Sequence, residues 1–433
     1  MKFYSTNNSA HRVHLPEAVL NGLAPDNGLY MPERIPVLSH DYFSSLASRS
    51  FQEIAFDVAS VFVEDAIPHD LLKRIIDHTI SFDAPLVEIE RNVLALELFH
   101  GPTLAFKDFG ARFMSQLLSH FAQQQNREIV ILVATSGDTG SAVANGFLGV
   151  EGTRVVVLYP SGKVSEIQEK QFTTLGQNIT AIEVAGTFDD CQKMVKQAFL
   201  NENLKSKFFL TSANSINIAR LIPQMFYYFY AWSRLAEKQN VVFSVPSGNF
   251  GNLTAGLMAQ RMGLPVQHFL AATNVNDVVP HYLATKEFLP RQSVSTISNA
   301  MDVGHPSNFA RMLALYDGDH EAMRKDVVGF AFTDEATQAA MKNVFLNTGY
   351  VLDPHAAIGY LGLKEFQATH PDTVGVFLAT AHPAKFSDVV ASATGTKVNM
   401  PERLQHFLNR KKESLKCAAD FDAFQQLLVS VLA

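Results

Sequence analysis

The fold is decided by the stretch Glu128-Ile129-Val130-Ile131-Leu132-Val133-Ala134-Thr135-Ser136-Gly137-Asp138-Thr139-Gly140. After Glu128 it continues with an uninterrupted apolar run of strand length, which is typical of a strand buried in a parallel sheet. A turn with hydroxyl groups and two glycines follows, and a helix is expected from there through Phe147. The stretch therefore predicts one strand-loop-helix unit of an α/β protein.

The same alternation extends outward from this stretch. Further strands are expected over residues 154–159, 179–184, 241–245, 266–272 and 373–379. Helices are expected between and around them, over residues 168–176, 188–201, 216–238, 253–262, 334–347, 356–369 and from 385, with a kink at Pro223. Strands separated by helices predict an α/β fold with two mainly parallel open sheets and flanking helices.

Three domains are expected. Residues 1–90 form an N-terminal accessory domain of short helices and one strand, without a chemical constellation. Residues 91–238 form the first α/β domain, and residues 239–433 form the second, which ends in a helical appendage from Leu404. Residues 285–320 are polar and irregular, so we expect a mobile loop over a site there.

Composition narrows the class of protein. The chain has 433 residues, 47% of them hydrophobic and 18% charged, which favours an ordered globular protein. A net charge of −7 argues against a nucleic-acid or anionic-membrane partner. Cys191 and Cys417 form neither a CxxC pair nor a disulfide framework, which indicates reduced thiols in a cytoplasmic protein. The sequence lacks an 18-residue apolar window, an HExxH motif and a G-x-S-x-G elbow, so we expect no membrane span, zinc site or serine hydrolase.

Lys107 is the first candidate for chemistry. It follows the chain break at Gly101-Pro102 and begins an expected helix in which Phe109 and Phe113 recur at helical spacing. Desolvation by neighbours such as Phe106 lowers the pKa of a lysine amine and fits it for Schiff-base chemistry. A surface lysine at a turn is the commoner interpretation of one lysine alone.

Two glycine loops at expected strand ends are candidate anion sites. Ser247-Gly248-Asn249-Phe250-Gly251-Asn252 can aim backbone N–H groups and a helix N-terminus at a phosphate. It is neither a Walker loop nor a GxGxxG fingerprint, and the alternative is a tight turn. The loop Thr135–Gly140 offers hydroxyls and backbone donors to a carboxylate or phosphate, and the alternative there is a helix cap.

Other polar groups follow expected strands. Thr380 can offer a hydroxyl to a ring nitrogen, although this segment also fits a structural turn. Ser215, Asn217 and Arg220 can bind an anion, with a capped helix and a solvated arginine as the alternative, and Lys163 is a weaker anion candidate. One lysine with phosphate cradles at sheet ends suggests pyridoxal 5′-phosphate, which needs an amine, a phosphate socket and a partner for its ring nitrogen.

At this point the chain resembles the threonine synthase family, pyridoxal-phosphate enzymes of the tryptophan-synthase β-type fold, fold type II. The similarity runs from end to end and rests on a set of motifs in a fixed order. They are residues 28–32 (GLYMP), 99–108 (FHGPTLAFKD), 134–140 (ATSGDTG), 214–217 (NSIN), 246–251 (PSGNFG) and 380–386 (TAHPAKF).

The resemblance implies roles for individual residues. Lys107 would be the Schiff-base lysine, and Thr380 would face the pyridine nitrogen. The cofactor phosphate would lie in the loop formed by Ser247, Gly248, Asn249, Phe250, Gly251 and Asn252. The substrate carboxylate would be bound by Thr135, Ser136, Gly137, Asp138 and Thr139, and the substrate phosphate by Ser215, Asn217, Arg220 and Lys163. Two positions need an explanation: Asp138 stands where cysteine-making relatives carry Asn, and Asn252 where many members carry Asp.

The implied activity is the last step of threonine biosynthesis. O-phospho-L-homoserine and water would give L-threonine and phosphate by β,γ-elimination and β-addition of water, with Lys107 as the base. The alternatives are another β-type lyase, such as a threonine dehydratase or a phospholyase, and a binding or signalling protein that kept the fold without the chemistry. We expect a monomer or small homo-oligomer without a metal.

Overall fold

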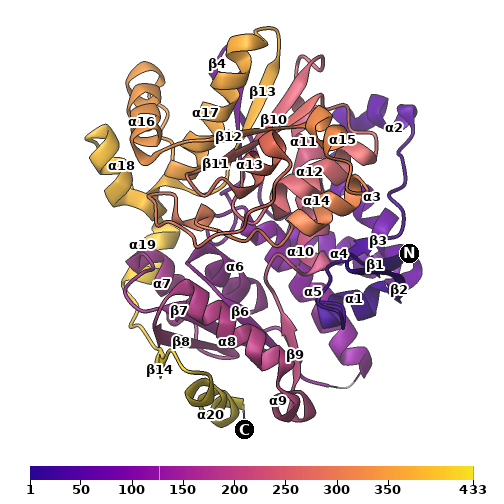
Figure 1. Ribbon diagram of the computed structural model, residues 1–433, viewed down its shortest axis with the longest axis vertical. Helices are drawn as coiled ribbons and strands as arrows, with labels where there is room; N and C mark the ends of the chain where they lie inside the picture. The colour runs from indigo at the N-terminus through magenta and orange to yellow at the C-terminus, as the bar shows by residue number, and fades with distance from the viewer. Residues whose placement is uncertain (126, 433) are drawn as a thin grey trace.

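A computed structural model describes residues 1–125 and 127–432 and contains two open sheets, one in each half of the molecule (Figure 1). The lower sheet has five strands in the order β14-β8-β7-β6-β9, and all its neighbouring strands are parallel. Its strands are β6 (Ile129–Ala134), β7 (Thr153–Pro160), β8 (Ile179–Ala185), β9 (Phe209–Ser212) and β14 (Leu415–Ala418). Every residue of β6 is buried, as its apolar run predicts.

The upper sheet has six strands in the order β12-β11-β10-β13-β5-β4, and only the edge strand β4 is antiparallel to its neighbour. Its strands are β4 (Leu86–Glu90), β5 (Val93–Glu97), β10 (Val241–Pro246), β11 (His268–Thr273), β12 (Val327–Ala331) and β13 (Val374–Ala379). The predicted α/β class with mainly parallel sheets is confirmed.

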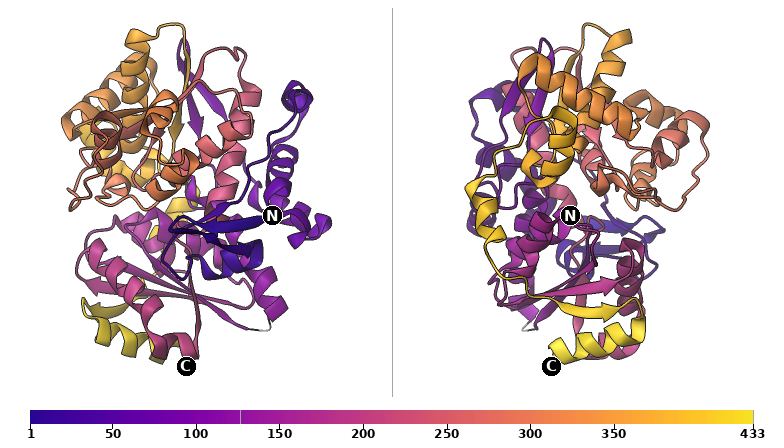
Figure 2. Two further views of the ribbon diagram at one scale, coloured as in Figure 1. Left: turned by 45° about the vertical axis from the view of Figure 1, so that its right-hand side comes forward. Right: turned by 90° about the vertical axis from the view of Figure 1, so that its left-hand side faces the viewer.

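Helices cover both sheets (Figures 1 and 2). Those of the lower half include α6 (Asp138–Phe147), α7 (Glu166–Thr173), α8 (Phe188–Leu200) and α9 (Glu202–Lys207). Those of the upper half include α12 (Gly251–Arg261), α13 (Val278–Thr285), α14 (Phe309–Leu315), α15 (His320–Asp326), α16 (Asp334–Thr348), α17 (Pro354–Thr369) and α18 (Ser387–Thr394).

The N-terminal region forms a three-stranded antiparallel sheet and four helices. These elements are β1 (Lys2–Ser5), β2 (Asn8–His14), β3 (Tyr30–Pro32), α1 (Leu15–Asn21), α2 (His40–Ser45), α3 (Phe51–Val63) and α4 (His69–Thr79). The four helices agree with the short helices expected in residues 1–90. The sheet was not predicted, because its strands are short and β2 is largely exposed.

The sheets do not follow the expected boundaries at 90/91 and 238/239. Strands β4 and β5 precede the first domain's helices but pair within the upper sheet. The C-terminal segment runs from the upper half down past α19 (Glu402–Leu408) to β14 and α20 (Phe421–Leu432) in the lower half (Figure 2). The expected helical appendage therefore contains a strand, and its course ties the two halves together.

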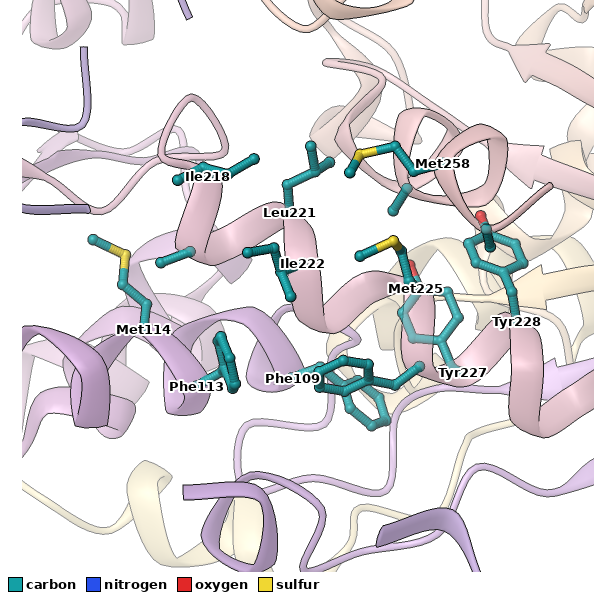
Figure 3. Packing of buried hydrophobic residues seen from close by; sticks show 14 of the residues in the cluster. Phe109, Phe113, Met114, Ile218, Leu221, Ile222, Met225, Tyr227, Tyr228 and Met258 are labelled. Carbon is teal, nitrogen blue, oxygen red and sulfur yellow. The ribbon is translucent and has the colours of Figure 1, made fainter. Parts of the chain in front are cut away.

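The predicted helix over residues 216–238 is shorter and is interrupted at Pro223, where we expected a kink. The segment divides into α10 (Ile218–Leu221), a 3-10 turn from Ile222 to Met225 and α11 (Phe226–Arg234), because Pro223 cannot continue the backbone ladder. This segment packs along α5 (Lys107–Gln125), as Figure 3 shows. The Phe109 and Tyr227 rings lie 5.6 Å apart, and the Phe113 and Phe226 rings 5.8 Å apart. The helix that starts at Lys107 is therefore fixed by a dense core.

Candidate active site

A cavity lies where strands β6, β10 and β13 end at their carboxyl termini. Thr135 and Ser136 line it after β6, Gly248 after β10 and Thr380 after β13. Lys107 reaches it from the start of α5. In open α/β sheets these ends are where ligands bind, so the predicted loops converge as expected.

The segment 285–320 contributes another wall of this cavity. Its irregular part runs from α13 to α14 with one 3-10 turn, Asn299–Met301, and residues 299–303, 305 and 307 line the cavity. The expectation that the segment lies over a site is met. Its mobility stays a prediction, and α14 occupies residues that we expected to be irregular.

Lys107 is half-buried at the cavity wall, and the Phe106 ring centroid lies 5.5 Å from its amine. Burial lowers the pKa of Lys107 to about 8, and the positive charges of Arg220 and Lys385 add to this effect while the Asp138 carboxylate opposes it. A substantial fraction of the amine is therefore neutral near pH 8, the form that can act as a nucleophile or base.

Asp138 does not line the cavity. Its Oδ1 forms a buried ion pair with Lys385 Nζ at 2.5 Å and accepts a hydrogen bond from Gln168 Nε2 at 2.8 Å. Burial alone would raise the pKa of Asp138, but Lys385, Lys107 and the two hydrogen bonds hold that pKa at about 2. The positive charge of Lys385 therefore neutralises the Asp138 carboxylate, which reduces its repulsion of a carboxylate ligand.

Lys385, the partner of Asp138, was not predicted, although it lies in the quoted motif 380–386. Its Nζ donates to the Thr103 carbonyl at 2.9 Å in addition to pairing with Asp138. Thr103 in turn donates its backbone N–H and hydroxyl to Asp108, at 2.9 and 2.6 Å. The only signal in the sequence was a lysine between Ala384 and Phe386, in an otherwise apolar turn.

In the β6–α6 loop, defined as residues 135–140, the Thr135 hydroxyl accepts from the N–H groups of Gly137 and Gly140 at 2.9 and 2.8 Å. Gly137 has φ = +142°, and a Cβ there would lie 2.6 Å from the Gln168 side chain, so only glycine fits. The side chains of Ser136 and Thr139 remain at the cavity. The loop therefore offers hydroxyl and backbone donors, with its carboxylate turned away.

In the β10–α12 loop, defined as residues 247–252, two polar side chains hold the turn itself. Asn252 Oδ1 accepts from the Ser247 hydroxyl at 3.0 Å, and its Nδ2 donates to the Pro246 carbonyl at 2.9 Å. Phe250 has a left-handed backbone, φ = 60°, just before α12 begins at Gly251. Because Asn252 is an amide, it can donate to the Pro246 carbonyl, which an ionised aspartate cannot. The loop presents a helix N-terminus without a charge of its own.

Arg220 and Ser215 line the same cavity, whereas Asn217 and Lys163 do not. Arg220 is buried, its NH1 donates to the Ala213 carbonyl at 2.5 Å, and burial lowers its pKa to about 10. Asn217 caps α10, and its Nδ2 donates to the Val19 carbonyl at 2.8 Å, so its side chain is already occupied. Lys163 is exposed on the surface after β7.

Three polar groups at the cavity have no hydrogen-bond partner within residues 1–125 and 127–432. They are Arg220 Nε, Asn214 Oδ1 and Asn299 Oδ1, all buried. An unpaired buried polar group is costly, and such groups around a cavity indicate a polar ligand. Asn214 and Asn299 were not predicted, because an asparagine outside a glycine loop carries no local signature of its ligand.

His355 also lines the cavity and was not predicted. Its Nδ1 lies 2.6 Å from Asp353 Oδ2, and its Nε2 accepts from the Ala300 N–H at 3.3 Å. Asp353 caps α17, so the histidine links that helix to the wall formed by residues 299–303. This arrangement orients the wall that faces Gly248, where a Cβ would lie 2.8 Å from Met301 Cα.

The residues present fit pyridoxal phosphate. A lysine with a lowered pKa, an uncharged glycine loop at a helix N-terminus and the Thr380 hydroxyl lie around one cavity, with unpaired polar atoms in its lining. These match the amine, phosphate socket and ring-nitrogen partner that the cofactor requires. The fold and this set of groups define a pyridoxal-phosphate-dependent enzyme of fold type II.

Comparison with known proteins gives the family. Residues 2–80 match the family described as threonine synthase N terminus, residues 81–380 that of pyridoxal-phosphate dependent enzymes, and residues 356–428 that of threonine synthase, C-terminal. The threonine synthase of Buchnera aphidicola subsp. Baizongia pistaciae is 43% identical, with 99% of this chain and all of the relative covered.

Two solved structures agree with that match. The crystal structure of threonine synthase from Escherichia coli has a TM-score of 0.94 and 42% identity, and covers 100% of both chains. The PLP-bound threonine synthase from Brucella melitensis has a TM-score of 0.92 and 34% identity, and covers 99% of this chain and 98% of its own. The chain belongs to the threonine synthase family. It is an enzyme, a pyridoxal-phosphate-dependent lyase, and the alternative of a binding protein without the chemistry is set aside.

Two features are absent from residues 1–125 and 127–432. None of the helices within residues 1–125 and 127–432 is long and apolar enough to cross a membrane. The same residues contain no group of three or more His, Cys, Asp and Glu side chains that could hold a metal ion.

Proposed function

We propose that this chain converts O-phospho-L-homoserine and water into L-threonine and phosphate. The observation that supports this most is that one cavity is lined by one lysine, Lys107, and by two polar faces that would each suit a phosphate. The first face is the uncharged β10–α12 loop, and the second contains Ser215 and Arg220. The cofactor carries one phosphate, so the second face suits a substrate that carries another.

The cofactor residues of the proposal come from three strand ends. Lys107 Nζ tethers the cofactor, and the backbone N–H groups of Gly248, Asn249, Phe250 and Gly251 bind its phosphate. Ser247 and Asn252 keep that loop in shape through their mutual hydrogen bond of 3.0 Å. The Thr380 hydroxyl meets the ring nitrogen. A hydroxyl cannot hold that nitrogen protonated by ion pairing as a carboxylate can, which limits side reactions such as transamination.

The substrate residues lie on the other two loops. Ser136 and Thr139 donate to the substrate carboxylate, together with backbone groups of the β6–α6 loop. Arg220, Ser215 and Asn214 bind the substrate phosphate. We leave Asn217 and Lys163 out of this site, because the first is occupied as a helix cap and the second is exposed away from the cavity.

The proposed chemistry centres on one base. When bound, the cofactor supplies an electron sink that stabilises negative charge beside the amine-bearing carbon. Lys107 Nζ removes the proton from Cα and then one from Cβ, which its lowered pKa permits near neutral pH. Arg220 stabilises the charge on phosphate as it leaves Cγ. Water then adds at Cβ, and Lys107 returns protons to the neighbouring carbons before threonine leaves.

We also propose that the enzyme acts as a monomer or small homo-oligomer in the cytoplasm. Both cysteines, Cys191 and Cys417, are buried as free thiols, which suits a reducing compartment.

The experiment is an assay of the purified holoenzyme with O-phospho-L-homoserine, in which released phosphate and the amino-acid product are both measured. The expected result is equal amounts of phosphate and L-threonine. Phosphate release with a different product would identify a phospholyase, and turnover of threonine without use of the phosphorylated substrate would identify a dehydratase. Either result would refute the proposal.

A further inference from the structure

Arg311 is a fully buried cation outside the cavity lining. It lies on α14, and all five of its N–H groups are used by neutral acceptors. Nε and NH2 each donate to the Tyr30 carbonyl at 3.1 Å, and NH1 and NH2 donate to the Ser215 and Ile216 carbonyls at 3.1 and 2.6 Å. NH1 also donates to Asn308 Oδ1 at 2.7 Å. Burying a charge carries a large desolvation penalty, so we expect the buried Arg311 guanidinium to serve a function.

The donors of Arg311 fix the orientation of one amide. A guanidinium can only donate, so the Asn308 atom that faces it must be the carbonyl oxygen. The Asn308 Nδ2 group is thereby turned to the Ser215 hydroxyl oxygen, to which it donates at 3.3 Å. The direction of this hydrogen bond therefore follows from the identity of residue 311.

A second amide is fixed in the same way. The backbone N–H of Ser307 donates to Asn249 Oδ1 at 2.5 Å, which turns Asn249 Nδ2 to the Ser215 hydroxyl oxygen at 2.7 Å. Ser215 Oγ thus receives two N–H donors, which is the full acceptor capacity of a hydroxyl. Its own proton remains, and the side chain lines the cavity. The hydroxyl can act there only as a donor.

We propose that Arg311 is a positioning residue that, through Asn308, makes the Ser215 hydroxyl an obligate donor to a phosphate oxygen of the substrate. The inference rests on the proposed function, because that assigns the second phosphate to the Ser215 face. The two bonds to the Tyr30 carbonyl extend the network to β3 of the N-terminal sheet. The N-terminal region therefore supports the phosphate site without lining the cavity.

The test uses the replacement of Asn308 by aspartate in the holoenzyme. A carboxylate at 308 still accepts from Arg311 and adds an ion pair, so we expect the protein to fold with an unchanged or higher Tm. It cannot donate, so the Ser215 proton turns to residue 308 instead of the ligand. The measurement is the Kd of inorganic phosphate by titration calorimetry, for wild type, Ser215→Ala, Asn308→Asp and the double variant.

The readout is a ratio that cancels the charge of the new carboxylate. We divide the loss of phosphate affinity caused by Asn308→Asp in the presence of Ser215 by the loss in the Ser215→Ala background. The expected ratio is about tenfold, the effect of one hydrogen bond to a charged group. A ratio within twofold of unity would overturn the inference.

The same design separates the inference from the proposed function. If Ser215→Ala alone leaves the phosphate Kd unchanged, the phosphate face itself is wrongly assigned and both fail. If Ser215→Ala weakens binding but the ratio is near unity, only the role of Arg311 and Asn308 fails. Arg311→Lys keeps a donor-only cation, so it should retain the dependence on Ser215, whereas Arg311→Met should lose it. Equal dependence in the two variants would contradict the inference even if both are less stable.

Discussion

The β6–α6 and β10–α12 loops look alike in sequence but differ in the structure. Each follows a buried strand, contains two glycines and leads into a helix. In the β6–α6 loop, Asp138 is buried and paired with Lys385 at 2.5 Å. In the β10–α12 loop, the buried side chains are neutral, and the Asn252 side chain bonds to its sequence neighbours Ser247, Pro246 and Leu253.

This difference separates two ways of preparing a glycine loop for an anion. The β10–α12 loop carries no acid, so its helix N-terminus remains fully available to a phosphate. The β6–α6 loop carries an acid next to hydroxyls that line the cavity, and Lys385, which is distant in sequence, neutralises that acid. The chemistry of such a loop is therefore decided by the partner of its charged side chain as well as by its glycines.

The largest loss of activity is expected for substitution of Lys107, the lysine between the two loops. Lys107→Ala should reduce turnover by about 10⁴-fold or more, because both the cofactor tether and the base are removed. The cofactor should still bind through the unchanged β10–α12 loop, which equilibrium dialysis can measure. Lys196→Ala, at an exposed position of α8, is the matched control and should leave turnover unchanged. Wild-type turnover in Lys107→Ala would remove this residue from the mechanism.

The next effect tests the charge of the β6–α6 loop. Lys385→Met should lower the free energy of unfolding by about 3–5 kcal/mol, because it leaves the Asp138 carboxylate buried without its partner. Adding Asp138→Asn should recover much of that loss, which urea unfolding at pH 7 can measure. Asn252→Ala in the other loop removes only neutral hydrogen bonds and should cost less. Equal losses from Lys385→Met and Asn252→Ala would erase the distinction between the loops.

A smaller effect concerns the substrate phosphate. Arg220→Ala should weaken binding of O-phospho-L-homoserine by about 10- to 100-fold, because a charge-assisted contact is lost. Binding of homoserine, which has no phosphate, should change little. The KM of O-phospho-L-homoserine and the inhibition constant of homoserine, each compared with the wild-type value, measure the discrimination. Equal weakening of the two ligands would place the phosphate elsewhere.

The smallest expected effect is a shift in the pH dependence of the rate at which the cofactor associates with the enzyme. The neutral Lys107 amine is the form that reacts, so cofactor association with the cofactor-free enzyme should quicken as pH rises through about 8. Asp138→Asn removes a charge that raises the pKa of Lys107, so the midpoint should fall. Lys385→Met removes a charge that lowers this pKa, so the midpoint should rise. Stopped-flow rates between pH 6 and 10 would contradict the account if both variants shifted in one direction.

The parts that the sequence predicted are those with local causes. The apolar run of β6, the glycine loops and the start of α5 at Lys107 all depend on neighbouring residues, and the structure places them where the patterns predicted. The lysine and the glycine loops suggested the cofactor, and the family resemblance supplied the residue roles. The local residue pattern alone left two alternatives open, a tight turn for residues 247–252 and a helix cap for residues 135–140.

The parts that the sequence did not predict depend on distant partners. Lys385 meets Asp138 across 247 positions, and Arg311 meets Tyr30 across 281, so no periodicity marks either pair. Asn217 has the residue type of an anion ligand, but Val19 and the first turn of α10 use its amide. Strands β12 and β14 were not predicted from the sequence, because they are short and depend on pairing with β11 and β8.

The most direct test of the account is a crystal structure of the holoenzyme with inorganic phosphate. The account predicts the cofactor phosphate on the backbone N–H groups of Gly248–Gly251 and a second phosphate within hydrogen-bond distance of Ser215 and Arg220. The β6–α6 loop should hold neither of them, with Asp138 still paired to Lys385. A phosphate bound by the β6–α6 loop, or a second phosphate away from Arg220, would contradict the assignment of the two loops.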